Sequence, residues 1–542
     1  MSISGIENST AWPAVMAKKL RDTLTLRNYS KGRAVKFQVG FSPSGPPHIG
    51  TCAEVIRTAM VMKAYEELTG NSTRLICLSD NLDGMKSLPK GYTDEHLDMP
   101  LCLIDDIDAK PRNVAFSKQH EDALHTALAP LNISYELVHS SALYDTPRAQ
   151  YVMNKILKHY DQIMEVILPT LGEDRRATYS PILPICPHTR KVLYVPTTPD
   201  YQKKTISYTD KLGKRVRVKV TPYNVKLQWK VDLPARWVGS FIDFEMYGKD
   251  HADSTHIYNR ICKILGGTPP VQMPYELFLD SDGSKISKSS GNGLTTAMWL
   301  NCATPQSLLY YIYKNPNKAK KFEPSVIPKI MDEYNNALYA FSEVVIGEDF
   351  KYNSPIHYCS YFLSLPEYFP ISYDHLINLI GASMTTDEEV ILKYIYKTVK
   401  CCELGYRDDE ITHFKEYINY AIQYFYTFIY PTLTFKAPSD SEKRILTSFA
   451  NEIENYNSHI ENVEHSSQLN QSFIFNFIKK NNLQPAEFFK SFYEVVFGSS
   501  SGPRLGTFMS LYGNHETSKL ILSTLASHDE GSTVQQRTII SN

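Results

Sequence analysis

VKFQVGFSPSGPPHIGTCAEVIRTAMVMKAYEELTG, residues 35–70, is the segment that decides the fold of this chain. Its first seven residues, 35–41, alternate and are rich in β-formers, so they predict a strand. After a turn of Ser, Pro and Gly, residues 48–68 have helical spacing and stop before Gly70. The next apolar run, RLICLS at 74–79, predicts a buried strand. A strand, a helix and a second strand over this distance form a βαβ unit, which indicates a parallel sheet.

The rest of the chain repeats this alternation and then changes character twice. The further elements that we expect are helices over 11–26, 147–168 and 253–265, and strands over 135–139, IDFEMYG and 275–280. Residues 171–232 hold proline pairs and short alternating runs such as RVRVKV, which predict a mostly β insertion. From about Pro305 the apolar spacing is helical nearly to the end.

These changes of pattern divide the chain into five expected parts. They are the first half of the sheet domain at 1–170, the insertion at 171–232, the second half at 233–310, an all-helical region at 311–527 and a disordered tail at 528–542. A chain of 542 residues with 42% hydrophobic and 21% charged residues has ordinary globular composition. Roughly two to four domains are expected at this length.

Charge and cysteine usage restrict the function only weakly. The formal net charge is -1, so no basic excess announces a nucleic-acid partner, although a local basic patch remains compatible with neutrality. No apolar run reaches the roughly 18 residues of a membrane span, and MSISGIENST lacks the features of a secretory signal. The nine scattered cysteines fit a reducing compartment, so we expect a cytoplasmic protein without a membrane partner.

The first candidate site is PSGPPHIGT, residues 43–51, at the junction of a strand and a helix. Unpaired amides at a helix N-terminus carry partial positive charge and attract phosphate. Gly45 and Gly50 let a ligand approach the backbone closely, and His48 has a ring that can donate to phosphate oxygens. Taken alone, His48 is more often a capping or packing residue.

The second candidate site is the loop SDGSKISKSSGNG, residues 281–293. Lys285 and Lys288 supply point charges for a polyphosphate, and small residues allow the loop to close over a bound nucleotide. Lysines placed in this way stabilise the charge that develops on a leaving pyrophosphate. Taken alone, such a loop is more often a solvated surface segment.

Together the two sites resemble the HIGH and KMSKS motifs of class I aminoacyl-tRNA synthetases. Six longer segments are similar to the class I lysine–tRNA ligases: GFSPSGPPHIGT (40–51), LSDNLDGMKSLP (78–89), KLQWKVDLPARW (226–237), FEMYGKDH (244–251), KISKSSGNGLT (285–295) and PRLGTFMSLYG (503–513). The resemblance implies an α/β fold, in which a Rossmann-like parallel-sheet catalytic domain carries a mostly β insertion. An all-α C-terminal anticodon-binding domain follows, and ATP binds at the carboxyl end of the sheet.

The activity that the resemblance implies is attachment of L-lysine to tRNA(Lys) in two steps. The lysine carboxylate attacks the α-phosphorus of ATP, and a ribose hydroxyl of the tRNA then attacks the lysyl-adenylate, so positioning and electrostatics suffice. ATP is accompanied by Mg²⁺, bound chiefly through its phosphates. We expect a monomer. Two alternatives are a class I synthetase for glutamate or glutamine and a nucleotidyltransferase with a HIGH motif.

The resemblance also assigns roles to particular residues. Those expected to be catalytic are His48, Lys285 and Lys288. Those expected to bind ATP are Pro43, Ser44, Gly45, His48, Gly50, Thr51, Lys249, Asp250, Lys285, Ser287, Lys288 and Ser289. Those expected to bind lysine are Gly40, Ser42, Asp80, Asp83, Trp229, Trp237 and His251. For the aspartates, turn capping is equally compatible with the sequence, and for the tryptophans core packing is the common alternative.

One departure from the family concerns zinc. Some members carry zinc knuckles with Cys-x-x-Cys pairs in the inserted region, whereas Cys186 and His188 here have no second cysteine pair nearby. Tetrahedral zinc requires four ligands, and only Cys102 and His96 from elsewhere could complete the set. We therefore expect no structural zinc and no protein metal site.

Overall fold

The computed structural model describes most of the chain and divides it into two compact units. The described residues are 4–27, 32–106, 114–286, 294–343, 348–383, 386–399, 408–456, 463–500, 502 and 504–529. The first unit comprises Met1–Thr296, Leu309–Glu323 and Val344–Ser364, and the second comprises Ala297–Leu308, Pro324–Glu343 and Leu365–Asn542. The two units therefore interleave along the sequence.

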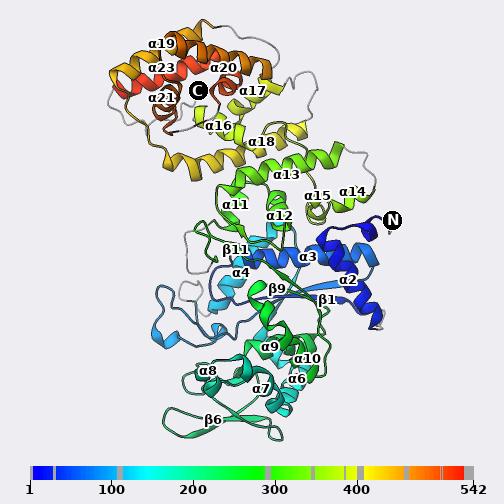
Figure 1. The fold of residues 1–542 in the computed structure, drawn as a ribbon. Helices are drawn as coiled ribbons and strands as arrows, with labels where there is room; N and C mark the ends of the chain where they lie inside the picture. The colour runs from blue at the N-terminus through cyan, green and yellow to red at the C-terminus, as the bar shows by residue number, and fades with distance from the viewer. Residues whose placement is uncertain are drawn as a thin grey trace. The chain divides into compact units, whose positions relative to one another are not determined.

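A five-stranded parallel sheet is the centre of the first unit (Figure 1). Its strands are β1 (Val35–Phe41), β2 (Thr73–Ser79), β3 (Glu136–His139), β9 (Phe244–Gly248) and β10 (Val271–Tyr275). They lie in the order β10-β9-β1-β2-β3, and all four neighbouring pairs are parallel. The predicted α/β fold with a parallel sheet is confirmed.

The strand order places a topological switch point at β1. β1 pairs with β2 along its whole length, from Val35 opposite Thr73 to Phe41 opposite Ser79. On its other side β1 pairs with β9, which the chain reaches only after the insertion. The connection that follows β1 leads to β2 and the connection that follows β9 leads to β10, toward the opposite edge, which opens a crevice at the carboxyl ends of β1 and β9, where such sheets bind ligands.

Helices cover both faces of this sheet, as a doubly wound fold requires. α2 (Trp12–Leu26) and α3 (Ile49–Thr69) pack together, and α3 contacts β1, β2 and β9. α3 ends at Gly70, whose φ of 69° is the left-handed conformation that favours glycine as a helix cap. A core on the other side of the sheet joins α9 (Trp229–Ser240) and α10 (Thr255–Ile264).

Two sequence predictions for this region are wrong in detail. The helix expected over 147–168 is two helices, α6 (Pro147–Lys158) and α7 (Tyr160–Ile167), because the backbone of His159 leaves the helical conformation. The insertion ends before residue 229 and not at 232, since α9 begins there.

The insertion itself is mostly β, as predicted. Its strands are β4 (Ile182–Pro184), β5 (Thr198–Asp200), β6 (Thr205–Thr209), β7 (Arg215–Lys219) and β8 (Val225–Leu227), and all their pairings are antiparallel. The smaller helices of the first unit are α1 (Ser4–Asn8), α4 (Phe116–Leu128), α5 (Ser140–Asp145), α8 (Glu173–Thr178), α14 (Glu348–Asn353) and α15 (Pro355–Cys359).

The strand expected over 275–280 is also placed wrongly. The sheet strand is β10, which ends at Tyr275, and Phe278–Leu279 form the separate strand β11, paired with β12 (Lys320–Lys321). β10 contains Pro274 and pairs with β9 alone, because it is the edge of the sheet. Proline is tolerated on an edge strand, where its missing donor breaks no ladder bond.

From residue 296 the described chain is almost entirely helical, as predicted. The helices are α11 (Thr296–Cys302), α12 (Pro305–Tyr313), α13 (Val326–Glu343), α16 (Tyr373–Ser383), α17 (Glu388–Val399), α18 (Asp408–Tyr424), α19 (Asp440–Glu454), α20 (Val463–Lys480), α21 (Pro485–Phe492), α22 (Leu505–Tyr512) and α23 (Asn514–Asp529). In the second unit, Phe449, Phe477 and Phe492 belong to a buried core between α19, α20 and α21. The expected tail at 528–542 lies outside the described residues beyond Asp529. None of the described helices is long and apolar enough to cross a membrane.

Candidate active site

A cavity of about 210 Å³ lies at the carboxyl ends of β1 and β9, at the predicted switch point. Nine of the residues singled out in the sequence line it: Gly40, Ser42, His48, Gly50, Thr51, Trp229, Asp250, His251 and Lys285. The strand-to-helix junction and the start of the lysine loop therefore share one cavity. Glu54, Glu245, Tyr247 and Tyr275 line it as well and were not expected from the sequence.

His48 both caps α3 and lines the cavity. It is the N-cap residue of α3, and its Nδ1 accepts a hydrogen bond from the Thr51 amide at 3.4 Å. An accepting Nδ1 in a neutral ring leaves the proton on Nε2, so His48 carries one ring donor. A Cβ atom on Gly50 would lie 2.8 Å from Cε1 of His48, so only glycine leaves room for the ring in this position. The capping role and the ligand role expected for His48 are therefore compatible.

The start of the lysine loop crosses the cavity beside β9. Lys285 Nζ lies 2.6 Å from Asp250 Oδ2 in an ion pair whose side chains are about half exposed. Burial raises the pKa of Asp250, but the hydrogen bond from Lys285 and the charges of His251 and Lys285 together outweigh it, and the net pKa is lowered. Lys249 points elsewhere, to Glu276 at 2.6 Å. The predicted residues Ser287, Lys288 and Ser289 lie outside the described residues.

Trp229 and His251 form one wall of the cavity. The indole Nε1–H donates to His251 Nδ1 at 3.2 Å, and the ring centroids are 5.4 Å apart. Burial lowers the pKa of His251, which favours the neutral ring that this hydrogen bond requires. The wall is thus uncharged and aromatic, a surface suited to an alkyl chain.

Two carboxyl groups, on Glu54 of α3 and Glu245 of β9, also border the cavity. The Tyr275 hydroxyl donates to Glu54, and the Gly40 amide donates to Glu54 Oε1 at 3.4 Å. Glu245 Oε2 accepts from the Gln38 amide at 2.8 Å and from the Trp237 indole at 3.1 Å. Neutral donors from β1, β10 and α9 therefore hold both carboxyl groups in place.

Neither of these carboxyl groups forms an ion pair in the described part of the chain, and the charges of Arg57 and Arg236 act on Glu54 and Glu245 only without direct contact. The polar contacts of both are with neutral donors, and no lysine, arginine or histidine forms an ion pair with either. Burial raises the pKa of Glu54 to about 7, and burial followed by the charge of Glu54 raises the pKa of Glu245 well above its usual range. A cationic ligand in the cavity would relieve this electrostatic cost.

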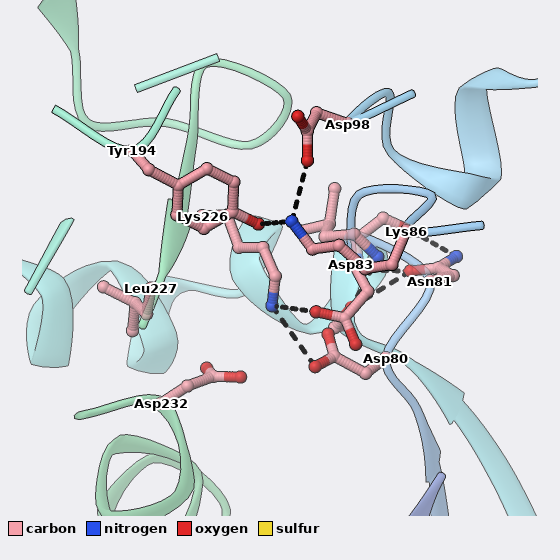
Figure 2. Close-up of polar contacts among 12 residues, drawn as sticks. Asp80, Asn81, Asp83, Lys86, Asp98, Tyr194, Lys226, Leu227 and Asp232 are labelled. Atoms are coloured by element: carbon pink, nitrogen blue, oxygen red, sulfur yellow. Dashed lines mark hydrogen bonds and ion pairs between the residues drawn. The ribbon is translucent and has the colours of Figure 1, made fainter. Parts of the chain in front are cut away.

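Several residues expected at the site lie away from the cavity lining. Asp80 and Asp83 are already paired with Lys226, whose Nζ lies 3.3 Å from Asp80 Oδ2 and 2.8 Å from Asp83 Oδ1 (Figure 2). Burial raises the pKa of Asp80, but the charges of Lys226 and Arg236 outweigh it and lower the pKa. An internal ammonium therefore occupies the position where the sequence led us to expect the substrate's ammonium.

The remaining assignments differ in how far the structure supports them. Trp237 is buried in the core, does not line the cavity and donates its indole N–H to Glu245, so its contact with lysine stays a prediction. Pro43, Ser44 and Gly45 form the turn before α3 without lining the cavity. In the sequence, Glu54 and Glu245 were detectable as charged residues inside otherwise apolar stretches of a helix and a strand.

The residues considered for zinc do not form a cluster in the described chain. Cys186 lies in the turn between Ile185 and Val192, where its amide donates to the Lys191 carbonyl, and Cys102 donates its amide to Asn81. Among the described residues, no three His, Cys, Asp or Glu side chains gather closely enough to hold a metal ion. The absence of structural zinc stays a prediction.

A parallel sheet with a cavity at its switch point, faced by a capped helix N-terminus and a lysine loop, is the arrangement of a class I aminoacyl-tRNA synthetase. Comparison with known proteins agrees with this class. Residues 10–359 match the model of the family "tRNA synthetases class I (K)". The chain belongs to this family.

Curated relatives cover nearly the whole chain. The lysine–tRNA ligase of Rickettsia bellii (strain OSU 85-389) is 38% identical over 528 residues, which are 95% of this chain and 97% of the relative. That of Rickettsia prowazekii (strain Madrid E) is 36% identical over 531 residues, with 96% and 98% covered. A solved glutamate tRNA ligase from Elizabethkingia meningosepticum is 10% identical with a TM-score of 0.34, covering 91% of this chain and all of that one, a likeness too low to bear on the fold.

We predict that Gly50→Ala impairs ATP use while the fold stays intact. The new Cβ atom would meet the His48 ring at 2.8 Å and displace its Nε2 donor from the cavity. The KM for ATP in amino-acid-dependent pyrophosphate exchange should rise on the order of tenfold, because the variant loses a correctly positioned hydrogen-bond donor to ATP. Gly239→Ala is the matched control, since its Cβ would meet nothing nearer than Val152 at 3.9 Å. Equal KM values for the two variants would show that the His48 ring does not serve ATP.

Proposed function

We propose that this protein attaches L-lysine to tRNA(Lys), using ATP with Mg²⁺ and forming a lysyl-adenylate that releases pyrophosphate and then AMP. Membership of the class I (K) family supports the reaction class. The two carboxyl groups at the cavity support the choice of lysine, because neither forms an ion pair in the described chain.

The charge of the cavity is the observation that distinguishes lysine from the alternative substrates. An ammonium near Glu54 and Glu245 would gain charge-assisted hydrogen bonds, typically worth about 1.5–3 kcal/mol each. The side chain of glutamate would be repelled by the same groups, and that of glutamine would leave them without a counter-charge. The aromatic wall of Trp229 and His251 suits the alkyl stem of lysine. A glutamate or glutamine synthetase, and a plain nucleotidyltransferase, account less well for these features.

Hydrogen-bond donors and a positively charged side chain are available for the phosphate groups of ATP. The amides at the start of α3, the Nε2 donor of His48 and the ammonium of Lys285 all belong to the cavity or its rim. Lys288, three residues further along the same loop, is assigned to the leaving pyrophosphate by the sequence motif. Mg²⁺ binds chiefly through the phosphates of ATP and neutralises part of their charge. The protein's own groups then position the reactants and stabilise developing charge, so no protein nucleophile is required.

The remaining assignments belong to this proposal as well. The helical region at 311–527 is the anticodon-binding part, where aromatic side chains stack on unpaired bases. The catalytic part is built from 1–170 and from the chain between the start of α9 at Trp229 and residue 310, with the segment from 171 to the start of α9 inserted. The enzyme acts in the cytoplasm as a monomer.

Aminoacylation of total tRNA with each amino acid in turn tests the proposal. Lysine should be the only amino acid that is attached, and pyrophosphate exchange should depend on lysine. Attachment of glutamate or glutamine would contradict the substrate, and nucleotide transfer without charging of any tRNA would contradict the synthetase reaction.

We predict that lysine binding in the absence of ATP strengthens as the pH rises from 6 to 8. The pKa of Glu54 is raised to about 7 in the free enzyme, and a bound ammonium favours the ionised carboxylate. Binding therefore releases a proton below pH 7, and the Kd should fall about tenfold over this range, following the ionised fraction. Calorimetry in two buffers of different ionisation enthalpy measures both quantities.

Glu54→Gln provides the control for this experiment. The variant should bind lysine more weakly and with little dependence on pH, since its amide does not titrate in this range. An unchanged pH dependence in Glu54→Gln would assign the titration to another group.

We predict that Lys288→Ala slows adenylate formation on the order of a hundredfold or more. The reason is that the variant loses a positive charge that stabilises the transition state. The loop carries the lysine as a point charge, so the fold should be unaffected. Lys211→Ala is the control, because Lys211 is an exposed lysine in a turn of the insertion. Single-turnover formation of the adenylate measures the rate, and a near-wild-type rate for Lys288→Ala would remove the catalytic role.

A further inference from the structure

Lys226 is a buried lysine that no step of the proposed reaction uses. It lies on β8 of the insertion, and its side chain is only 6% exposed. Its ammonium reaches the carboxyl end of β2, where it lies 3.3 Å from Asp80 Oδ2 and 2.8 Å from Asp83 Oδ1 (Figure 2). A buried charge is costly unless it is paired, so this placement demands an explanation.

The ion pair continues inward through Asp80. Arg236 NH2 lies 3.2 Å from Asp80 Oδ1, and the same guanidinium pairs with Asp232 one turn earlier on α9. Asp232 Oδ1 in turn accepts a hydrogen bond from the Tyr144 hydroxyl at 2.8 Å. Apart from Asp83, which is 36% exposed, the charged side chains of this network are buried. Two cations and three carboxylates thus share one buried network.

The inner end of the network supports the cavity wall. The Arg236 guanidinium lies 5.3 Å from the centre of the Trp229 ring, a cation–π distance. A Cβ atom on Gly40 would lie 4.0 Å from Arg236 NH1, so the guanidinium also borders the end of β1. Trp229 holds His251 through its indole hydrogen bond. A continuous series of contacts therefore runs from Lys226 to the aromatic wall of the cavity.

We propose that Lys226 is a positioning residue for amino-acid binding, which holds Asp80 so that Arg236 stays against Trp229. This inference rests on the proposed function, because it concerns the same cavity. Asp80 and Asp83 then act through Lys226 and Arg236 and do not contact the substrate.

The sharing of Arg236 between two carboxylates explains why the ammonium of Lys226 is needed. Without the ammonium of Lys226, Asp80 would have Arg236 as its one cationic partner in the described network. The guanidinium would then be drawn toward Asp80 and away from Trp229, because opposite charges at low dielectric attract strongly. Asp80 Oδ1 is held by the ion pair with Arg236 NH2 at 3.2 Å, and Arg236 Nε makes no hydrogen bond among the described residues, so the guanidinium depends on its two carboxylate partners for its position.

Lys226→Met tests the proposal by steady-state pyrophosphate exchange. The KM for lysine should rise on the order of tenfold, while kcat and the KM for ATP change less than about twofold, because only the amino-acid wall moves. Lys226→Arg keeps the charge and should restore most of the lysine KM. Lys86→Met is the matched control: Lys86 pairs with Asp98 and lies over Tyr194, but at an exposed site, and no change is expected.

A second variant separates positioning from stability. Lys226→Met leaves Asp80 short of a partner and should lower the unfolding temperature, whereas Lys226→Met with Asp80→Asn removes both charges and should recover it. In the double variant the lysine KM should stay raised, because Asp80→Asn removes one of the two carboxylates that hold Arg236 and leaves it paired with Asp232 alone. A lysine KM that recovers together with the unfolding temperature, or a KM for ATP that rises as much as that for lysine, would overturn the proposal.

Pyrophosphate exchange by the wild-type enzyme shows whether the positioning role of Lys226 or the proposed function itself is wrong. If it exchanges pyrophosphate with a different amino acid, the proposed substrate is wrong, and the KM of that amino acid becomes the readout for the same variants.

Discussion

Two carboxyl groups, on Glu54 and Glu245, border one cavity and form no ion pair in the described chain, and the specificity of the site depends on this constraint. Both carboxyl groups lie at a cavity where burial raises their pKa values, and both are held by neutral donors from the surrounding strands and helices. Such an arrangement is costly in the empty protein and becomes favourable when a cation enters. The fold thus stores an electrostatic preference for a positively charged ligand.

The same cavity is also lined by hydrogen-bond donors and by a lysine. The N-terminus of α3 with His48, and the loop that begins at Lys285, supply donors and positive charge suited to phosphate. Segments more than 200 residues apart meet there because β1 and β9 are neighbours in the sheet. In the proposed reaction the carboxylate of lysine must lie beside the α-phosphorus of ATP, and a cavity at the switch point that offers both carboxyl groups and phosphate-binding donors suits the two substrates together.

The sequence predicted the parts of this molecule that depend on local pattern. The alternation in 35–41, the helical spacing after His48 and the glycine at 70 predicted β1 and α3 nearly to the residue. The edge strand β10 was expected at 275–280 instead of Val271–Tyr275, because a proline at position 274 disfavours a strand in the local sequence. Proline is acceptable there only because β10 is the edge of the sheet. The partner of Asp80 lies 146 residues away, on β8, so no local signal distinguishes an aspartate that meets the substrate from one that meets Lys226. A charged residue within an apolar helix, as at Glu54, was the available signal that went unused.

The most direct test of the central claim compares lysine with norleucine, which has the same alkyl stem but lacks the terminal ammonium. Equilibrium binding of both ligands is measured for the wild-type protein and for the double variant Glu54→Gln/Glu245→Gln. The account predicts a preference for lysine on the order of a hundredfold in the wild type that falls below about tenfold in the variant, as expected when buried carboxyl groups read the ammonium. A preference that survives the double substitution unchanged would contradict it.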